Sequence, residues 1–151
     1  CGANFKCVQG SCVPDAECDA GKPCPEGKKC EGGKCVVDIC QPDSIYFDFD
    51  ESAIRSDARD TLNAGYACIQ KRGLAPKTTV AIEGNCDERG SDEYNMALGT
   101  RRAEAARKFL LHLGLKRNQA KSISYGEERP TCSDASESCW SRNRRVDIKM
   151  P

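Results

Sequence analysis

The stretch that decides the fold of this 151-residue chain is residues 83–103, which read EGNCDERGSDEYNMALGTRRA. A strand leads into a polar loop, and Ser91 is a good N-cap for the helix that follows. Asp92 and Glu93 occupy the first turn of that helix, where the helix dipole favours negative charge, and Gly114 marks its end. The stretch therefore predicts a strand, a polar loop and a long helix in succession.

Hydrophobic periodicity on either side predicts the remaining elements. The alternation of Ile45, Phe47 and Phe49 indicates a half-buried strand over 44–49. The other expected elements are a helix capped by Ser56 and ending at Gly73, and strands over 79–83, 121–125 and 144–150. The expected buried stripe of the long helix comprises Tyr94, Leu98, Ala105, Phe109, Leu110 and Leu113. This order predicts an α/β sandwich (βαβαββ) with the helices packed on one face of a mixed sheet.

The first 40 residues form a different kind of segment. They hold eight of the twelve cysteines, and Cys1-x5-Cys7-x4-Cys12 recurs 23 residues later, beginning at Cys24. A segment of this size with so few large apolar residues normally depends on disulfides. We expect a disulfide-rich segment over 1–40 and a separate domain over 43–151.

Composition excludes several classes of function. The 23 basic and 23 acidic residues cancel, so no net field attracts nucleic acid, and none is expected as a partner. The cysteine content indicates an oxidising compartment. The cysteine spacings differ from zinc knuckles, and the single histidine, His112, cannot complete a ligand set. We expect no metal, no cofactor and no enzyme activity, because the sequence has no nucleophile–base pair or cofactor loop. No apolar run approaches the roughly 20 residues that span a bilayer.

Four cysteines belong to the expected domain, and they permit three pairings. Cys132 and Cys139 bracket a short loop segment, so a local pair is the simplest arrangement. Cys68 would then pair with Cys86 and connect the first helix to the polar loop.

Two charged residues suggest a site for a small zwitterion. Asp87 stands where the strand ends and could receive an ammonium group. Arg102 offers a forked donor suited to a carboxylate. Arg102 lies about three turns along the helix, however, so spacing alone does not bring the two together. The alternative is a surface ion pair of little energetic value.

Residues 83–103 resemble the signature of the peptidoglycan-associated lipoproteins, a branch of the OmpA-like C-terminal domains. Three further segments agree with that family in the same order, namely 45–50, 124–130 and 143–146. The resemblance covers about residues 43–150 and does not include residues 1–40.

The resemblance implies non-covalent binding of the peptidoglycan stem peptide through meso-diaminopimelate. The family's aspartate that matches Asp87 takes the ammonium group, and the arginine that matches Arg102 takes the carboxylate. The residues that match Asn95, Phe49 and Asp50 line the pocket. Arg144 belongs to the motif that flanks this pocket in the family.

The resemblance also implies a location and partners. Family members lie in the periplasm, connect the outer membrane to the wall and engage proteins of the Tol system. Their mature first residue is a lipidated cysteine, which would correspond to Cys1. The repeat instead aligns Cys1 with Cys24, which favours a disulfide. An alternative function is a surface structural or adhesion protein whose repeats bind a partner protein, with the OmpA-like domain as its wall anchor.

Overall fold

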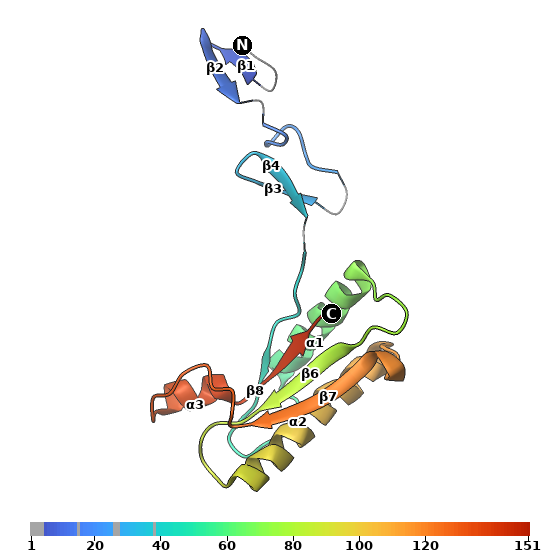
Figure 1. The fold of residues 1–151 in the computed structure, drawn as a ribbon, viewed down its shortest axis with the longest axis vertical. Helices are drawn as coiled ribbons and strands as arrows, with labels where there is room; N and C mark the ends of the chain where they lie inside the picture. Colours follow the sequence, from blue (N-terminus) through green and yellow to red (C-terminus); the bar gives the residue numbers. More distant parts are fainter. Residues whose placement is uncertain (1–4, 15, 26–27, 38) are drawn as a thin grey trace. The chain divides into compact units, whose positions relative to one another are not determined.

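The computed structural model describes residues 5–14, 16–25, 28–37 and 39–151. The chain divides into two units, and the border falls between Ile39 and Cys40 (Figure 1).

The N-terminal unit contains two antiparallel hairpins of the same design. Their strands are β1 (Phe5–Val8), β2 (Ser11–Pro14), β3 (Lys28–Glu31) and β4 (Lys34–Val37). Cys7 faces Cys12 in the first hairpin, and Cys30 faces Cys35 at the matching position of the second. The 23-residue repeat of the sequence is therefore a repeat of structure as well.

Disulfides, rather than a hydrophobic core, hold the second hairpin. Cys18 is bonded to Cys30 and Cys24 to Cys35. Among the side chains described in this unit, only Cys18 is buried. Cys7 is an exposed free thiol. Cys1, the expected lipidation site, lies outside the described residues.

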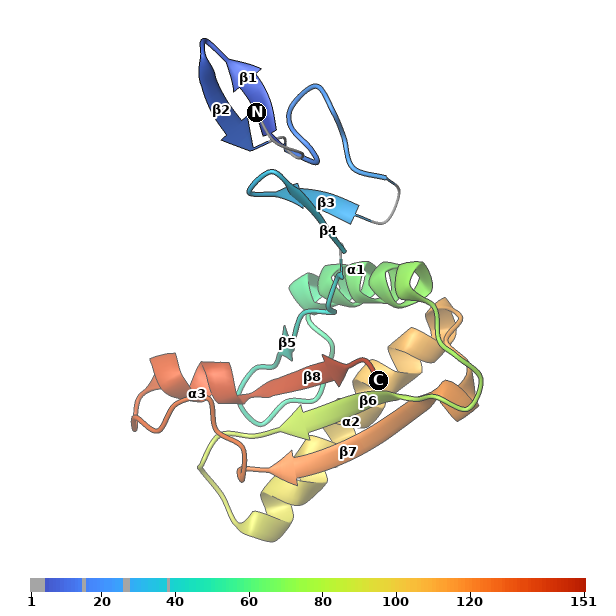
Figure 2. The same ribbon diagram turned by 45° about the horizontal axis from the view of Figure 1, so that its top comes forward.

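The second unit, Cys40–Pro151, is built on a four-stranded sheet in the order β5-β8-β6-β7. Its elements are β5 (Ile45–Tyr46), α1 (Ser56–Arg72), β6 (Val80–Asn85), α2 (Asp92–Leu113), the short 3-10 helix η1 (Arg117–Gln119), β7 (Ala120–Gly126), α3 (Glu137–Asn143) and β8 (Arg145–Lys149). β6 and β7 are parallel, and the other neighbours are antiparallel. Figure 2 shows α1 and α2 packed on one face of this mixed sheet, which is the expected fold class.

The core fills the space between the sheet and these two helices. Phe47, Leu62, Ile82, Leu110 and Val146 are all fully buried there. No helix within the described residues combines the length and apolar character needed to cross a membrane.

Two glycines let α2 lie directly against β6. A Cβ atom on Gly84 would lie 1.9 Å from the carbonyl oxygen of Gly99, and one on Gly99 would lie 2.2 Å from Ser124 Oγ. The close approach rotates the buried face of α2 relative to the expected stripe. Asn95, Gly99, Arg102, Ala103 and Ala106 are buried, whereas Tyr94 is 43% exposed.

Three local expectations need correction. Arg55, not Ser56, is the N-cap of α1, and it makes no side-chain capping hydrogen bond. The first strand is limited to β5, because the chain leaves the sheet after Phe47 and adopts a left-handed φ of 56° at Asp50. The expected loop before the last strand contains α3.

The expected Cys68–Cys86 disulfide is also wrong. Cys68 is bonded to Cys40, and Cys86 is a buried free thiol. Cys132 and Cys139 form a disulfide around the turn that leads into α3. In sequence, Cys40 belongs to the disulfide-rich segment expected over 1–40, whereas its disulfide partner lies on α1 of the domain.

Candidate functional site

A cavity of about 220 Å³ lies where three segments of the domain meet. These segments are the loop after β5, the loop between β6 and α2, and the first turns of α2. The lining residues are Phe49, Asp50, Cys86, Asp87, Arg89, Gly90, Tyr94, Asn95, Leu98 and Arg102. Two carboxylates and two guanidinium groups thus share a small cavity with apolar side chains.

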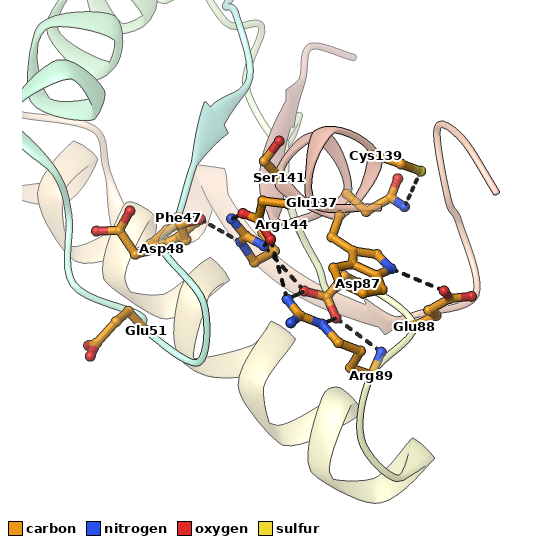
Figure 3. Close-up of polar contacts among 12 residues, drawn as sticks. Phe47, Asp48, Glu51, Asp87, Glu88, Arg89, Glu137, Cys139, Ser141 and Arg144 are labelled. Atoms are coloured by element: carbon orange, nitrogen blue, oxygen red, sulfur yellow. Dashed lines mark hydrogen bonds and ion pairs between the residues drawn. The ribbon is translucent and has the colours of Figure 1, made fainter. Parts of the chain in front are cut away.

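Asp87 is almost fully buried and is held by two arginines (Figure 3). The backbone N–H and Nε of Arg89 donate to Oδ1 at 3.0 and 3.2 Å, and its Nη2 donates to Oδ2 at 3.0 Å. Nη1 of Arg144 lies 3.5 Å from Oδ2. The carboxylate therefore has a cationic partner on two sides.

These partners set the charge of Asp87. Burial alone would raise the pKa of its carboxyl group, because a buried charge loses its hydration. The hydrogen bonds from Arg89 and the positive charges of Arg89 and Arg144 outweigh that effect, so the pKa lies below its ordinary value of 3.8. Asp87 is consequently a carboxylate at neutral pH.

Arg102 is also buried, but its partners are backbone carbonyl groups. Nε donates to Glu51 at 2.8 Å, Nη1 to Asn85 at 3.1 Å and Nη2 to Asp48 at 3.2 Å. The side chain therefore fastens the loop after β5 to the end of β6. A guanidinium group has five N–H donors, so the three carbonyl groups leave two, and the side chain also interacts with the Cys86 thiol. Burial lowers the pKa of Arg102, but an arginine remains cationic.

The loop after β5 contributes two residues to the mouth of the cavity. Asp50 accepts a hydrogen bond from the Tyr94 hydroxyl group, which connects the loop to the start of α2. Phe49 is 57% exposed, and its ring centroid lies 4.1 Å from Cζ of Arg89.

Arg89 contacts a second aromatic ring, since the ring centroid of Trp140 lies 4.0 Å from its Cζ. The indole N–H of Trp140 donates to Glu88 at 3.0 Å. This arrangement holds the Arg89 side chain over Asp87. Trp140, which comes from α3, is therefore not part of the hydrophobic core, and Arg89 occupies the ring face on which a ligand could stack.

Asn95 and Cys86 fasten the loop between β6 and α2 from inside. The Asn95 amide nitrogen donates to Glu127 at 2.8 Å and to the carbonyl oxygen of Asp87 at 3.4 Å. The Cys86 thiol donates to the carbonyl oxygen of Asn95 at 3.2 Å. Burial raises the pKa of the Cys86 thiol, so it is not an activated nucleophile.

Arg144 lies behind Asp87 and does not line the cavity. Its Nε donates to the carbonyl oxygen of Phe47 at 3.0 Å, and its Nη2 donates to Glu137 at 2.6 Å. That hydrogen bond lowers the pKa of Glu137. Arg144 thus positions Asp87 and the loop after β5.

The structure brings five of the six residues expected at the site to one cavity, namely Asp87, Arg102, Asn95, Phe49 and Asp50. Arg89, Tyr94 and Leu98 also line it and were not expected from the sequence. The sequence could have indicated Arg89 as a site residue, because its positive charge stands two positions after Asp87. The sequence could not have indicated that Arg89 stacks on Trp140, because the two residues are 51 positions apart.

One group of cysteines has the proximity of a metal site. The sulfur atoms of Cys18, Cys24 and Cys35 lie within 4.8 Å of one another. All three are oxidised in the disulfides Cys18–Cys30 and Cys24–Cys35, and a disulfide sulfur is not the thiolate that binds zinc. The group is therefore a pair of adjacent disulfides.

The fold and the cavity define the class of protein. The sequence model of the OmpA family matches residues 46–144, and the chain belongs to that family. Its relatives place it in the branch of the peptidoglycan-associated lipoproteins. It is 48% identical over 104 residues to the peptidoglycan-associated lipoprotein of Brucella melitensis, an alignment that covers 69% of this chain and 60% of that protein. It is 38% identical over 140 residues to the protein of that name from Pasteurella multocida, with 92% and 91% covered. The chain thus spans only about 60% of the Brucella relative.

Solved structures agree with this placement. The crystal structure of the peptidoglycan-associated lipoprotein from Burkholderia pseudomallei superposes with a TM-score of 0.63 at 38% identity, covering 70% of this chain and 86% of that one. The C-terminal domain of Helicobacter pylori MotB gives a TM-score of 0.65 at 25% identity, covering 72% and 84%.

Proposed function

We propose that this protein binds peptidoglycan non-covalently, through the amino and carboxylate groups at the free end of a diaminopimelate side chain. The observation that carries the proposal is that Asp87 and Arg102 line the same cavity with opposite charges. An ammonium and a carboxylate on one carbon atom match that pair. The names of the relatives support peptidoglycan as the polymer that is bound.

Binding requires an exchange of partners at Asp87. Its carboxylate is occupied by Arg89, so the ligand ammonium must replace Arg89 there. Arg89 remains stacked on Phe49 and Trp140 and keeps Glu137 within 3.8 Å, which limits the cost of its displacement. The N–H groups of Arg102 not used by carbonyl oxygens then bind the ligand carboxylate.

The role that follows is adhesion without bond cleavage. Cys86 is the only thiol among the lining residues, and it is held protonated by burial. We place the protein in the cell envelope, as a tether between the outer membrane and the wall. Binding of Tol-system proteins belongs to the same proposal.

The tether needs an anchor at its other end, and Cys1 is the candidate. An acyl mass on the N-terminal peptide of the protein purified from its host would establish a lipid anchor. A disulfide-linked Cys1 peptide would exclude it.

The ligand is tested by titrating the full chain with two peptides that differ at one residue. A stem tripeptide ending in meso-diaminopimelate should bind, and the lysine version, which lacks the terminal carboxylate, should bind at least roughly tenfold more weakly because Arg102 loses its partner. Asp87→Asn should abolish co-sedimentation with purified sacculi, whereas Asp60→Asn, on the exposed face of α1, should not. Sedimentation of Asp87→Asn at the wild-type level would overturn the assignment.

A further inference from the structure

The segment that enters the domain is attached to α1 before it reaches the sheet. Cys40 forms a disulfide with Cys68. The carbonyl oxygen of Cys40 accepts a hydrogen bond from Arg72 Nη1 at 3.2 Å. Pro42 is buried beside Gly65, where an added Cβ would lie 3.3 Å from Pro42 Cβ. One covalent bond and two non-covalent contacts therefore fix this segment to the helix.

Beyond this attachment, the chain pairs only briefly with the sheet, places Ile45 and Phe47 in the core and leads directly into the cavity. β5 pairs with β8 at only two positions, on the edge of the sheet. The next few residues include Phe49 and Asp50, which line the cavity. They also include Asp48 and Glu51, whose carbonyl oxygens bind Arg102. The loop over 47–51 thus connects the shortest strand of the domain to its proposed ligand-binding groups.

A tether carries tension, and tension applied to the N-terminal unit arrives at Cys40. Without the disulfide, it would act in series on Pro42, on the two residue pairs of β5 and on the loop over 47–51. With the disulfide in place, the tension enters α1, whose Leu62 and Ile69 are buried in the core.

We infer that the Cys40–Cys68 disulfide is a load clamp, which transmits tension from the N-terminal unit into α1 and keeps the loop over 47–51 unloaded while ligand is bound. This inference rests on the proposed function as a wall tether. It assigns a mechanical role to a disulfide at the border of the two units.

The chain supplies a matched control in its other domain disulfide. Cys132–Cys139 closes a short loop with a sequence separation of 7 and lies outside the path from Cys40 to the cavity. A disulfide that only stabilises the fold would shorten the bound lifetime on removal whichever end of the chain is pulled.

The experiment measures bond lifetime under force. The full chain is held by its N-terminal end in an optical trap and pulled from an immobilised diaminopimelate-containing stem peptide. For Cys40→Ser/Cys68→Ser we expect an unchanged zero-force affinity and a bound lifetime shortened roughly tenfold under load. Cys132→Ser/Cys139→Ser should keep the wild-type lifetime. When the chain is instead held by its C-terminal end, Cys40→Ser/Cys68→Ser should have the wild-type bound lifetime, because the applied force then does not pass through Cys40.

The inference is overturned if both double variants lose lifetime equally, or if the loss persists with the C-terminal handle. A ligand-free measurement keeps it testable even if the peptide does not bind. When the chain is pulled between its two ends, Cys40→Ser/Cys68→Ser should show an early extension of roughly 50 Å as residues 41–55 peel away. Wild type should not show it. An early extension of this size in both proteins, or in neither, contradicts the load clamp. Failure of the peptide to bind, taken alone, contradicts only the proposed function.

Discussion

The two charged sides of the cavity are built in different ways. Asp87 is held chiefly by the side chain of Arg89, which is 32% exposed. Arg102 is held by three backbone carbonyl groups from two separate segments and is completely buried. A side-chain partner can rotate away, whereas a backbone carbonyl cannot move without moving the loop that carries it.

The difference separates two roles that the sequence had treated as equal. In the proposed function, Asp87 exchanges Arg89 for a ligand with little change to the fold. Arg102 fixes the geometry of the cavity, and in the proposed function it also binds the ligand. The predictions that follow test this contrast, from the largest expected effect to the smallest.

Replacement of Arg102 should disrupt the fold as well as binding. Arg102→Ala leaves three carbonyl oxygens without their donor and opens a cavity beside the core. We expect the free energy of unfolding to fall by roughly 3–5 kcal/mol, measured by chemical denaturation. Arg101→Ala, at the exposed neighbouring position, should change it by less than about 0.5 kcal/mol. An Arg102→Ala variant of wild-type stability would show that the carbonyl contacts are unimportant.

The Asp87 side should respond to acid. Its folded pKa lies below the ordinary value of 3.8, so the charged form and its contribution to stability are fully present above that pH. They are lost as the pH falls through the lower, folded pKa. Ligand affinity should therefore be constant from neutral pH down to about pH 4 and then decline. Isothermal titration across this range checks the prediction, and a decline that begins near pH 6 would contradict it.

Removal of Arg89 should reveal its competition with the ligand. Arg89→Gln frees Asp87 in the empty cavity, so affinity at pH 7 should rise by roughly two- to tenfold. Burial then dominates at Asp87, its pKa rises, and the acid-induced loss of binding should begin at a higher pH than in wild type. Arg142→Gln, an exposed arginine of α3, is the control. Weaker binding of Arg89→Gln at pH 7 would mean that Arg89 contacts the ligand directly.

The smallest effect is expected at Trp140. Trp140→Ala removes one ring from the stack on Arg89, which is worth about 1 kcal/mol at a partly exposed site. We expect a stability loss of that order and a small gain in ligand affinity, because Arg89 leaves Asp87 more easily. Trp140→Phe keeps a ring and should restore most of the wild-type behaviour. Thermal melts and the same titration measure both quantities.

Much of the domain follows from local sequence signals. Ser91 caps α2 as expected, with Tyr94 N donating to its hydroxyl group at 3.2 Å, and Gly114 ends the helix. The 23-residue cysteine period of the sequence is matched in the structure by two hairpins of one design. Capping, turn chemistry and strand alternation depend on neighbours within a few residues, so the sequence displays them directly.

Other features of the structure could not be predicted from short-range sequence patterns. Cys40 looked like part of the N-terminal repeats, and only the folded chain shows it bonded to Cys68. The rotation of α2 follows from the contact between Gly84 and Gly99, which no helical period reveals. The structure also places Trp140 over Arg89 by means of α3, a helix that the polar loop sequence did not indicate.

The sequence by itself determined the order of the elements apart from α3, the contrast between a disulfide-rich segment and a domain with a core, and the charges offered to a ligand. These depend on composition and short-range pattern. Tertiary structure alone decided that Arg102 meets the carbonyl groups of Asp48 and Glu51, more than 50 positions away, and that Arg89 covers Asp87. The physical reason is that a buried charge takes whichever partners the packed chain brings within hydrogen-bonding distance, and chain packing is a property of the whole domain.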